Sequence, residues 1–180
     1  MLVGKTPYDC GIFLTRRRQY LFDSCDVPAP YLVSSGDEPD FMSLGIENSR
    51  RFRALPVWLS LLVYGRVGIT GWIKRNVDMA KRLADWLEQS EGYELVYPCQ
   101  LNVVLFRPKA SDLAAAEHDA LTTQTLANIN RDGRLFLSPG VWQGKKIIRA
   151  ALSNWQTDDQ DIEIAQAALA DVAEHKFVAK

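Results

Sequence analysis

The feature that most constrains the fold is a long stripe of apolar residues between positions 69 and 87. Its members recur at spacings of three and four, which is the period of a helix with one buried face. They are Ile69, Trp72, Ile73, Val77, Ala80, Leu83, Ala84 and Leu87. The stripe therefore predicts an amphipathic helix that must pack against another element of the fold.

Weaker patterns on both sides of this helix predict the other elements. A preceding helix is expected from near Leu55 to Gly65, because Pro56 is tolerated only in a first turn. The pattern then favours strands at residues 93–97, 101–107, 135–137 and 145–152 and a helix at 112–130. Thr157 and Gln160 match a capping box for a last helix. The order ααββαββα predicts an α/β chain whose small α+β domain has an antiparallel sheet with helices on one face.

The first 50 residues are less regular. A short apolar run at residues 10–15, bounded by a glycine and three arginines, predicts a buried strand. From Asp23 to Asn48 the sequence is dense in Pro, Ser, Gly and Asp and lacks periodicity. So long a loop in a compact domain is usually functional or mobile. We therefore expect this loop to be the first place to look for catalytic residues.

Charge and hydropathy bound the class of protein. The chain has 21 basic and 22 acidic residues and a net charge of -1, which would not gather nucleic acid or anionic lipid. The longest apolar run, at residues 54–64, is shorter than the roughly 20 residues of a membrane helix. No secretory leader opens the sequence. We therefore expect a cytoplasmic protein with neither nucleic acid nor a membrane as partner.

The cysteines and histidines point to no familiar site. Cys10, Cys25 and Cys99 show no CxxC spacing, so neither a disulfide framework nor a zinc site is predicted. His118 and His175 are far apart in segments that look helical, and both are expected at the surface. No serine–histidine, cysteine–histidine or metal-ligand grouping is present in the sequence, which argues against a stand-alone enzyme of another class.

Three stretches together resemble one family. They are TPYDCG at residues 6–11, ENSRRFRALPVW at 47–58 and IIRAALSNWQTDDQDI at 147–162. The resemblance is to the pyridoxal-phosphate-dependent group II amino-acid decarboxylases, which include the aromatic-amino-acid, histidine and glutamate decarboxylases. The middle stretch is the most specific, because helix formation does not require its arginines and tryptophan. The match covers nearly the whole chain, but only the last third or so of a family member.

The resemblance implies the C-terminal part of a fold-type I enzyme, which in the family is a homodimer. Residues 1–22 would be a remnant of the large cofactor domain, 23–48 a catalytic loop, 49–90 bridging helices and 91–180 the small domain. Pyridoxal phosphate is the family's cofactor, but most groups that hold it lie upstream of this sequence. We therefore expect this chain alone to bind no pyridoxal phosphate.

Lys5 is not expected to replace the family's cofactor lysine. In the family that lysine stands five residues before the proline of the PYD stretch, and counting back from Pro7 lands on Leu2. Lys5 lies three positions further along, which in an extended chain is ~10 Å, with its side chain on the other face. We interpret Lys5 as a solvated charge.

The resemblance assigns roles to three other residues. Tyr31 stands where the family has a catalytic tyrosine that returns a proton after carbon dioxide leaves; alternatively, it anchors a loop. Ser49 stands where a small residue helps to set substrate size, or it caps a helix. Arg149 matches an arginine that binds a substrate carboxylate in glutamate-type relatives. As a charge in an apolar strand, Arg149 could instead form a structural ion pair.

Two arginine groups carry weaker hypotheses. Residues 50, 51 and 53 could form an anion site or pair with other surface groups, while residues 16–18 favour a solvated face. The expected function is therefore the C-terminal part of an amino-acid decarboxylase that is inactive alone. Its partner would be an N-terminal portion of such an enzyme or a second copy, and its substrate an amino acid. The alternative is an interaction or regulatory module derived from such an enzyme.

Overall fold

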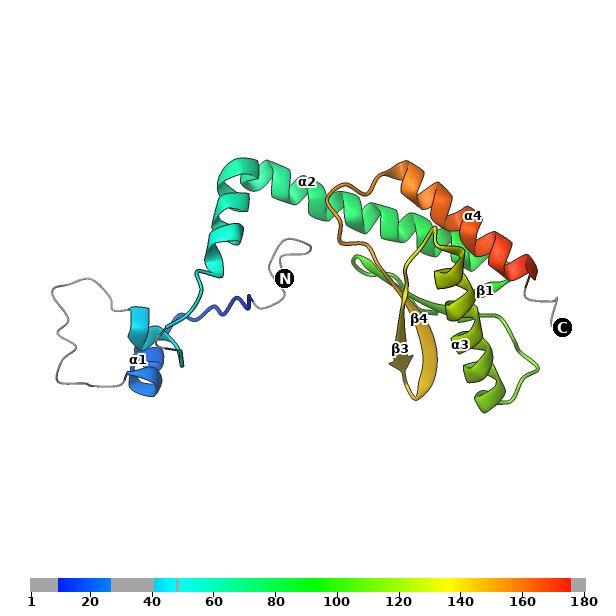
Figure 1. Cartoon of the computed structure of the whole chain (residues 1–180), viewed down its shortest axis with the longest axis horizontal. Coiled ribbons are helices and arrows are strands. Elements are labelled where there is room, and N and C mark those ends of the chain that lie inside the picture. Colours follow the sequence, from blue (N-terminus) through cyan, green and yellow to red (C-terminus); the bar gives the residue numbers. More distant parts are fainter. Residues whose placement is uncertain (1–9, 27–40, 48, 176–180) are drawn as a thin grey trace. The chain divides into compact units, whose positions relative to one another are not determined.

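The computed structural model describes residues 10–26, 41–47 and 49–175 of the chain. The chain divides into two compact units, Met1–Gly65 and Arg66–Lys180 (Figure 1). This division falls inside the segment expected to bridge two domains, at residues 49–90. The domain boundaries expected at residues 22, 48 and 90 stay predictions.

The first unit contains short helical elements. They are α1 (Gln19–Cys25), the 3-10 helix η1 (Phe41–Leu44) and the first turns of α2 (Ala54–Gln89). The buried hydroxyl of Ser43 in η1 donates a hydrogen bond of 2.7 Å to the Asp26 carboxylate, which follows α1. The segment expected to be a long loop therefore includes the end of one helix and a second short one, while residues 27–40 lie outside the described part.

The strand expected at residues 10–15 is wrong. No strand is assigned there, and residues 11–15 are exposed. A strand needs a neighbour to satisfy its backbone N–H and C=O groups. All strands in the described part of the chain lie between residues 93 and 151 and pair with one another. The apolar run at residues 10–15 therefore has no neighbouring strand among the described residues with which it could pair.

The two consecutive helices expected around Gly65 are confirmed. Helix α2 begins at Ala54, so that Pro56 falls in its first turn, and it is interrupted at Gly65, where φ is 59° and ψ is -173°. Glycine adopts a positive φ without a Cβ clash. Beyond this break the second half of the expected stripe is buried, at Ala80, Leu83, Ala84 and Leu87, whereas Ile73 in its first half is 38% exposed.

Among the described helices, α2 is long and apolar enough to cross a membrane, judged by length and composition only. Its most apolar window has a mean hydropathy of 1.3. Two features argue against a continuous span. The break at Gly65 frees backbone polar groups that would lack partners in lipid. The end of the helix, from Ala80 to Leu87, belongs to the core of the second unit, although none of the most apolar window is buried.

The second unit contains a four-stranded antiparallel sheet in the order β1-β2-β4-β3. The strands are β1 (Tyr93–Tyr97), β2 (Val103–Pro108), β3 (Ser138–Trp142) and β4 (Lys145–Ala151). Three of them lie where the sequence predicts them. The strand expected at residues 135–137 is wrong, because β3 begins just after it. Pro139 and Gly140 give β3 a low strand propensity, so the sequence pattern does not indicate a strand there. The sheet tolerates the proline because β3 is an edge strand.

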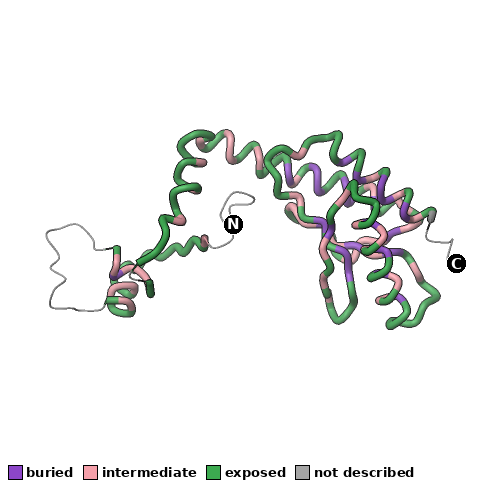
Figure 2. Tube along the Cα trace, in the orientation of Figure 1, coloured by how far each residue is buried: buried purple, intermediate pink, exposed green. Residues whose placement is uncertain are grey.

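The helices pack on one face of this sheet and bury a single core. Figure 2 shows the buried positions gathered in the second unit. The core joins α2, the sheet, α3 (Ala115–Asp132) and α4 (Asp159–His175), through Leu83, Leu87, Tyr93, Val104, Phe106, Ile129, Ile148, Ala150 and Leu169. The predicted arrangement of helices on one face of a small antiparallel sheet is therefore confirmed.

Tyr93 is the polar anchor of this core. Its ring meets Phe106 edge to face, with centroids 5.5 Å apart, and its hydroxyl donates a hydrogen bond of 2.9 Å to the Leu169 carbonyl in α4. Burial raises the pKa of the Tyr93 phenol above its ordinary value. The hydroxyl thus stays protonated and joins the sheet to α4.

The ends of two helices are fixed by side chains. The Asp158 carboxylate accepts hydrogen bonds from the N–H groups of Gln160 and Asp161, and the Asp161 carboxylate accepts one from the Asp158 N–H. The capping pair is therefore Asp158 with Asp161, one residue beyond the expected Thr157 and Gln160. In the last turn of α3, Asn130 exchanges two hydrogen bonds with the backbone of Leu137, which follows the helix.

Candidate functional site

The sheet face opposite the helices carries part of the candidate site. Leu95 pairs with Phe106, but Tyr97 pairs with Leu105, because a bulge shifts the register between them. The bulge moves the Tyr97 side chain to the face away from the core. There its ring approaches Trp142 of the opposite edge strand, with centroids 5.1 Å apart. We call this side the open face.

Arg149 lies on the open face, in register with Leu105 and Ser138. It is exposed and therefore does not carry the cost of a buried charge, because its neighbours Ile148 and Ala150 are the residues that face the core. Its guanidinium lies 3.5 Å from the Ser138 hydroxyl. Among the described residues it has no carboxylate partner, so the structural ion pair is not formed there.

Ser49 lies exposed in a bend of the first unit. Helix α2 begins five residues later, at Ala54, so Ser49 does not cap it. Nearby, Arg53 forms an ion pair of 2.6 Å with Glu47, and this contact lowers the pKa of the Glu47 carboxyl. Arg50 lies 3.5 Å from the Phe41 carbonyl. These contacts favour local pairing over an anion site at this arginine group.

The predicted site residues are not brought together by the structure. Tyr31 and Lys5 lie outside the described residues. Ser49 belongs to the first unit and Arg149 to the second. The roles assigned to Tyr31, Ser49 and Arg149 therefore stay predictions.

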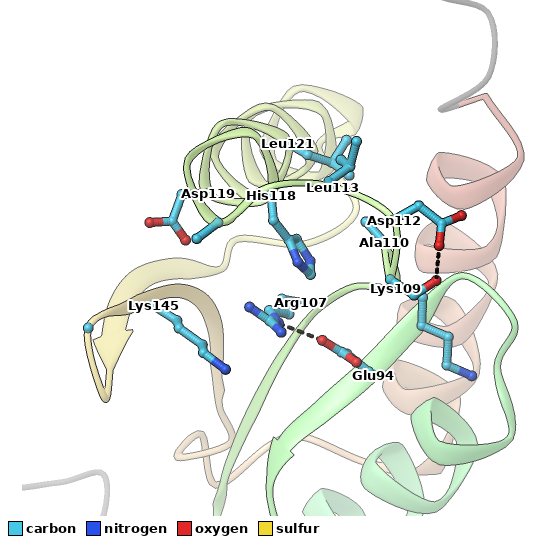
Figure 3. A pocket seen from close by; sticks show the side chains of 13 residues that line it. Glu94, Arg107, Lys109, Ala110, Asp112, Leu113, His118, Asp119, Leu121 and Lys145 are labelled. Atoms are coloured by element: carbon cyan, nitrogen blue, oxygen red, sulfur yellow. Dashed lines mark hydrogen bonds and ion pairs between the residues drawn. The ribbon is translucent and has the colours of Figure 1, made fainter.

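A cavity of about 800 Å³ lies in the second unit at the end of β2. Its walls come from β1, β2, the loop that follows β2, the start of α3 and the turn between β3 and β4 (Figure 3). The lining residues are Glu94, Arg107, Lys109, Ala110, Ser111, Asp112, Leu113, Ala115, His118, Asp119, Leu121, Gly144 and Lys145. The lining thus combines charged side chains with the apolar side chains of Leu113 and Leu121.

At this cavity β2 and β4 no longer pair, although β2 continues to Pro108. The last pair between these strands is Phe106 with Ile148, whereas β4 begins at Lys145. The N–H of Lys146 donates a hydrogen bond of 2.9 Å to the Asp119 carboxylate of α3. Asp119 of α3 thus accepts a hydrogen bond from β4 beyond the last pair with β2, and the start of α3 lines the cavity.

His118 and Arg107 point toward each other in this cavity (Figure 3). The Nε2 atom of His118 lies 2.7 Å from the Pro108 carbonyl, which can only accept, so Nε2 carries the proton. His118 is buried, which corrects the expectation of a surface residue. The Nε atom of Arg107 donates a hydrogen bond of 2.5 Å to Glu94.

Sequence reasoning did not find this cavity. One signal was present: His118, Thr122, Thr125 and Ile129 recur at spacings of three and four, and all are buried on α3. The stripe is mostly polar, so a search for apolar periodicity passes over it. The pairing of Glu94 with Arg107 depends on the strand register, which the sequence alone does not give.

Comparison with known proteins identifies the class. The family described as the pyridoxal-dependent decarboxylase conserved domain matches residues 3–109, more than half of the chain. The chain therefore belongs to the pyridoxal-dependent decarboxylase family.

Individual relatives agree with this membership. An aromatic-L-amino-acid decarboxylase of Bacillus atrophaeus is 32% identical over 161 residues, which are 87% of this chain and 34% of that protein. A 3,4-dihydroxyphenylacetaldehyde synthase of Drosophila melanogaster is 28% identical over 96% of this chain and 34% of its own length. The chain thus spans about a third of the length of the curated relatives that it matches.

The fold also matches solved structures of the family. The Oryza sativa TDC structure with PLP and tryptamine superposes with a TM-score of 0.76 at 22% identity, over 86% of this chain and 33% of that one. Together with the mixed helices and the small antiparallel sheet, this match shows the fold of a C-terminal part of such a decarboxylase.

The described residues do not fit the cofactor of this family. A lysine that forms a catalytic imine with pyridoxal phosphate is activated by an enclosed pocket, where water is excluded and the neutral amine is favoured. Lys74, Lys81, Lys109, Lys145 and Lys146 are the described lysines, and each is exposed. Even the two that line the cavity at the end of β2 are not enclosed. The part of the chain that the structure describes thus offers no lysine suited to this chemistry.

Proposed function

We propose that this chain is the C-terminal part of a pyridoxal-phosphate-dependent amino-acid decarboxylase and that it requires the remaining part of the enzyme for activity. The observation that carries the proposal is the share of each relative that this chain matches. The relatives align along 87% and 96% of this chain but only a third of their own length. A second support is that the described lysines are all exposed.

In the completed enzyme, the residues of this chain would act on the substrate and not hold the cofactor. Tyr31 would return the proton after carbon dioxide leaves, since a positioned phenol can act as a general acid. Arg149 would bind an acidic substrate group, because it is exposed and lacks a carboxylate partner among the described residues. Ser49 would line the pocket and limit substrate size.

The missing part would also cover apolar surface. In the first unit, Trp58, Leu62 and Val63 on α2 are 53%, 61% and 73% exposed. Apolar groups gathered in this way mark interaction surfaces in soluble proteins. We propose that the N-terminal part of the enzyme covers them and that the completed enzyme is a cytoplasmic homodimer without a membrane or nucleic-acid partner.

Co-expression tests the proposal. The chain is expressed with and without the complementary N-terminal two-thirds of the Bacillus atrophaeus relative, and carbon dioxide release is measured from aromatic, imidazole and acidic amino acids. We expect release only from the combination. Formation of a stable complex without any release would favour the alternative, an interaction or regulatory module, and would refute the proposed activity.

Variants of the combined enzyme test the residue roles. Tyr31→Phe should lower amine formation by about 10²-fold or more, the usual contribution of a general acid. Arg149→Met should raise KM for acidic substrates more than for aromatic ones. Arg131→Met is a matched control, because Arg131 is an exposed arginine of the same unit on α3. Equal effects of Arg149→Met and Arg131→Met would refute the substrate role of Arg149.

A further inference from the structure

The cavity at the end of β2 has hydrogen-bond donors that lack acceptors in the part of the chain that the structure describes. We propose that it binds a small organic carboxylate, held by Arg107 and Lys145. This inference concerns the second unit alone and does not rest on the proposed decarboxylase function. It follows from the partners of the charged side chains that line the cavity.

The three acidic residues of the lining are engaged. Glu94 accepts from Arg107 Nε at 2.5 Å, Asp112 accepts from the Ser111 hydroxyl at 3.1 Å, and Asp119 accepts from the Lys146 N–H at 2.9 Å. In Figure 3 the Asp119 and Asp112 carboxylates lie at opposite ends of the lining, while Glu94 faces Arg107. Glu94 is therefore the acid that competes for the centre of the cavity.

The basic residues of the lining have fewer of their hydrogen-bond donors engaged. Lys109 donates to the Ser90 carbonyl at 2.6 Å. Arg107 contacts Glu94 through Nε, and its two terminal nitrogens have no acceptor among the described residues. Lys145 has none there either. Its side chain extends toward Arg107 in Figure 3. Two cations with available donors therefore face one carboxylate.

This imbalance matches a carboxylate ligand. A guanidinium binds a planar carboxylate through two parallel hydrogen bonds, and an ammonium adds a point charge. The Arg107 side chain is only 16% exposed, which strengthens its interactions relative to water. Leu113 and Leu121 supply an apolar wall for the carbon part of the ligand. About 800 Å³ is within the usual range for small-molecule sites.

Titration of the full chain with malonate tests the inference. The sequence contains two histidines, so the imidazole NMR resonances of His118 can be assigned with a single His175→Gln variant. We expect a saturable shift of the His118 resonances with malonate and weaker binding of inorganic phosphate. Phosphate binding as tight as malonate binding, or no saturable shift at about 20 mM malonate, would overturn the proposal.

Two variants make the test specific. Lys145→Gln should weaken malonate binding about tenfold, the usual effect of losing one charge-assisted hydrogen bond. Lys146→Gln is the matched control, because the Lys146 side chain instead contacts Thr123 of α3 at 3.2 Å; we expect its affinity to stay within about twofold of the unaltered chain. Equal weakening by both substitutions would contradict the site.

Glu94→Gln tests whether the cavity prefers an anion or a cation. This variant removes the competing carboxylate but keeps the side-chain shape, so we expect malonate to bind more tightly. A cation site would behave in the opposite way, with saturable binding of ethylammonium that Glu94→Gln abolishes. That outcome would refute the carboxylate assignment.

Discussion

Replacement of Phe106 by alanine tests whether the second unit has the core described above. Phe106 is fully buried (0% exposed) between the sheet and the helices and meets Tyr93 edge to face. Removal of a buried phenylalanine side chain lowers the free energy of unfolding by roughly 3–5 kcal/mol. The edge-to-face contact places the expected loss in the upper part of this range.

A matched control is available on the same chain. Phe136 is 87% exposed, and its replacement by alanine should change the free energy of unfolding by less than about 0.5 kcal/mol. Urea unfolding followed by far-UV circular dichroism measures both. With a slope of about 2 kcal/mol/M, Phe106→Ala should lower the midpoint by about 2 M. Phe106→Leu serves if the alanine variant does not fold, with an expected loss of roughly 1 kcal/mol. Equal midpoints for the Phe106 and Phe136 variants would refute the packing.

Three further predictions follow from individual contacts. Asn130→Ala should lower the free energy of unfolding by about 1–3 kcal/mol, because both backbone groups of Leu137 lose their partner; urea unfolding measures the loss, and no change would contradict it. Hydrogen bonds from Arg134 lower the folded-state pKa of the Asp132 carboxyl, so its stabilising contribution is complete above the ordinary pKa near 4 and is lost as pH falls through the folded value. Asp132→Asn should therefore flatten acid unfolding curves below about pH 4, and curves of unchanged slope would exclude this role. Borohydride reduction in the presence of pyridoxal phosphate should leave Lys5 unmodified by mass spectrometry, whereas a stoichiometric adduct would overturn the spacing argument.

The helices and three of the strands of the second unit could be predicted from the sequence because their apolar patterns are local. The stripe along α2 and the runs of β1, β2 and β4 carry the period of their element. Strand β3 could not be predicted in this way. Pro139 and Gly140 have low strand propensity, and pairing with β4, which comes later in the chain, holds them in the sheet.

The site was harder to predict because it depends on register and on contacts between distant segments. Arg149 was found as a candidate, but its face follows from the pairing of β4 with β2 and β3. The burial of His118 follows from its contact with the Pro108 carbonyl. Arg107 and Lys145 come from different strands and line one cavity beyond the last pair of β2 with β4. None of these relations is a pattern within one element.

The most direct test of the central claim is carbon dioxide release from carboxyl-labelled amino acids by purified components. This chain, the N-terminal two-thirds of the Bacillus atrophaeus relative and their equimolar mixture are assayed with pyridoxal phosphate present. We expect release from the mixture and none from either part alone. Release from this chain alone would contradict the claim that it needs the rest of the enzyme.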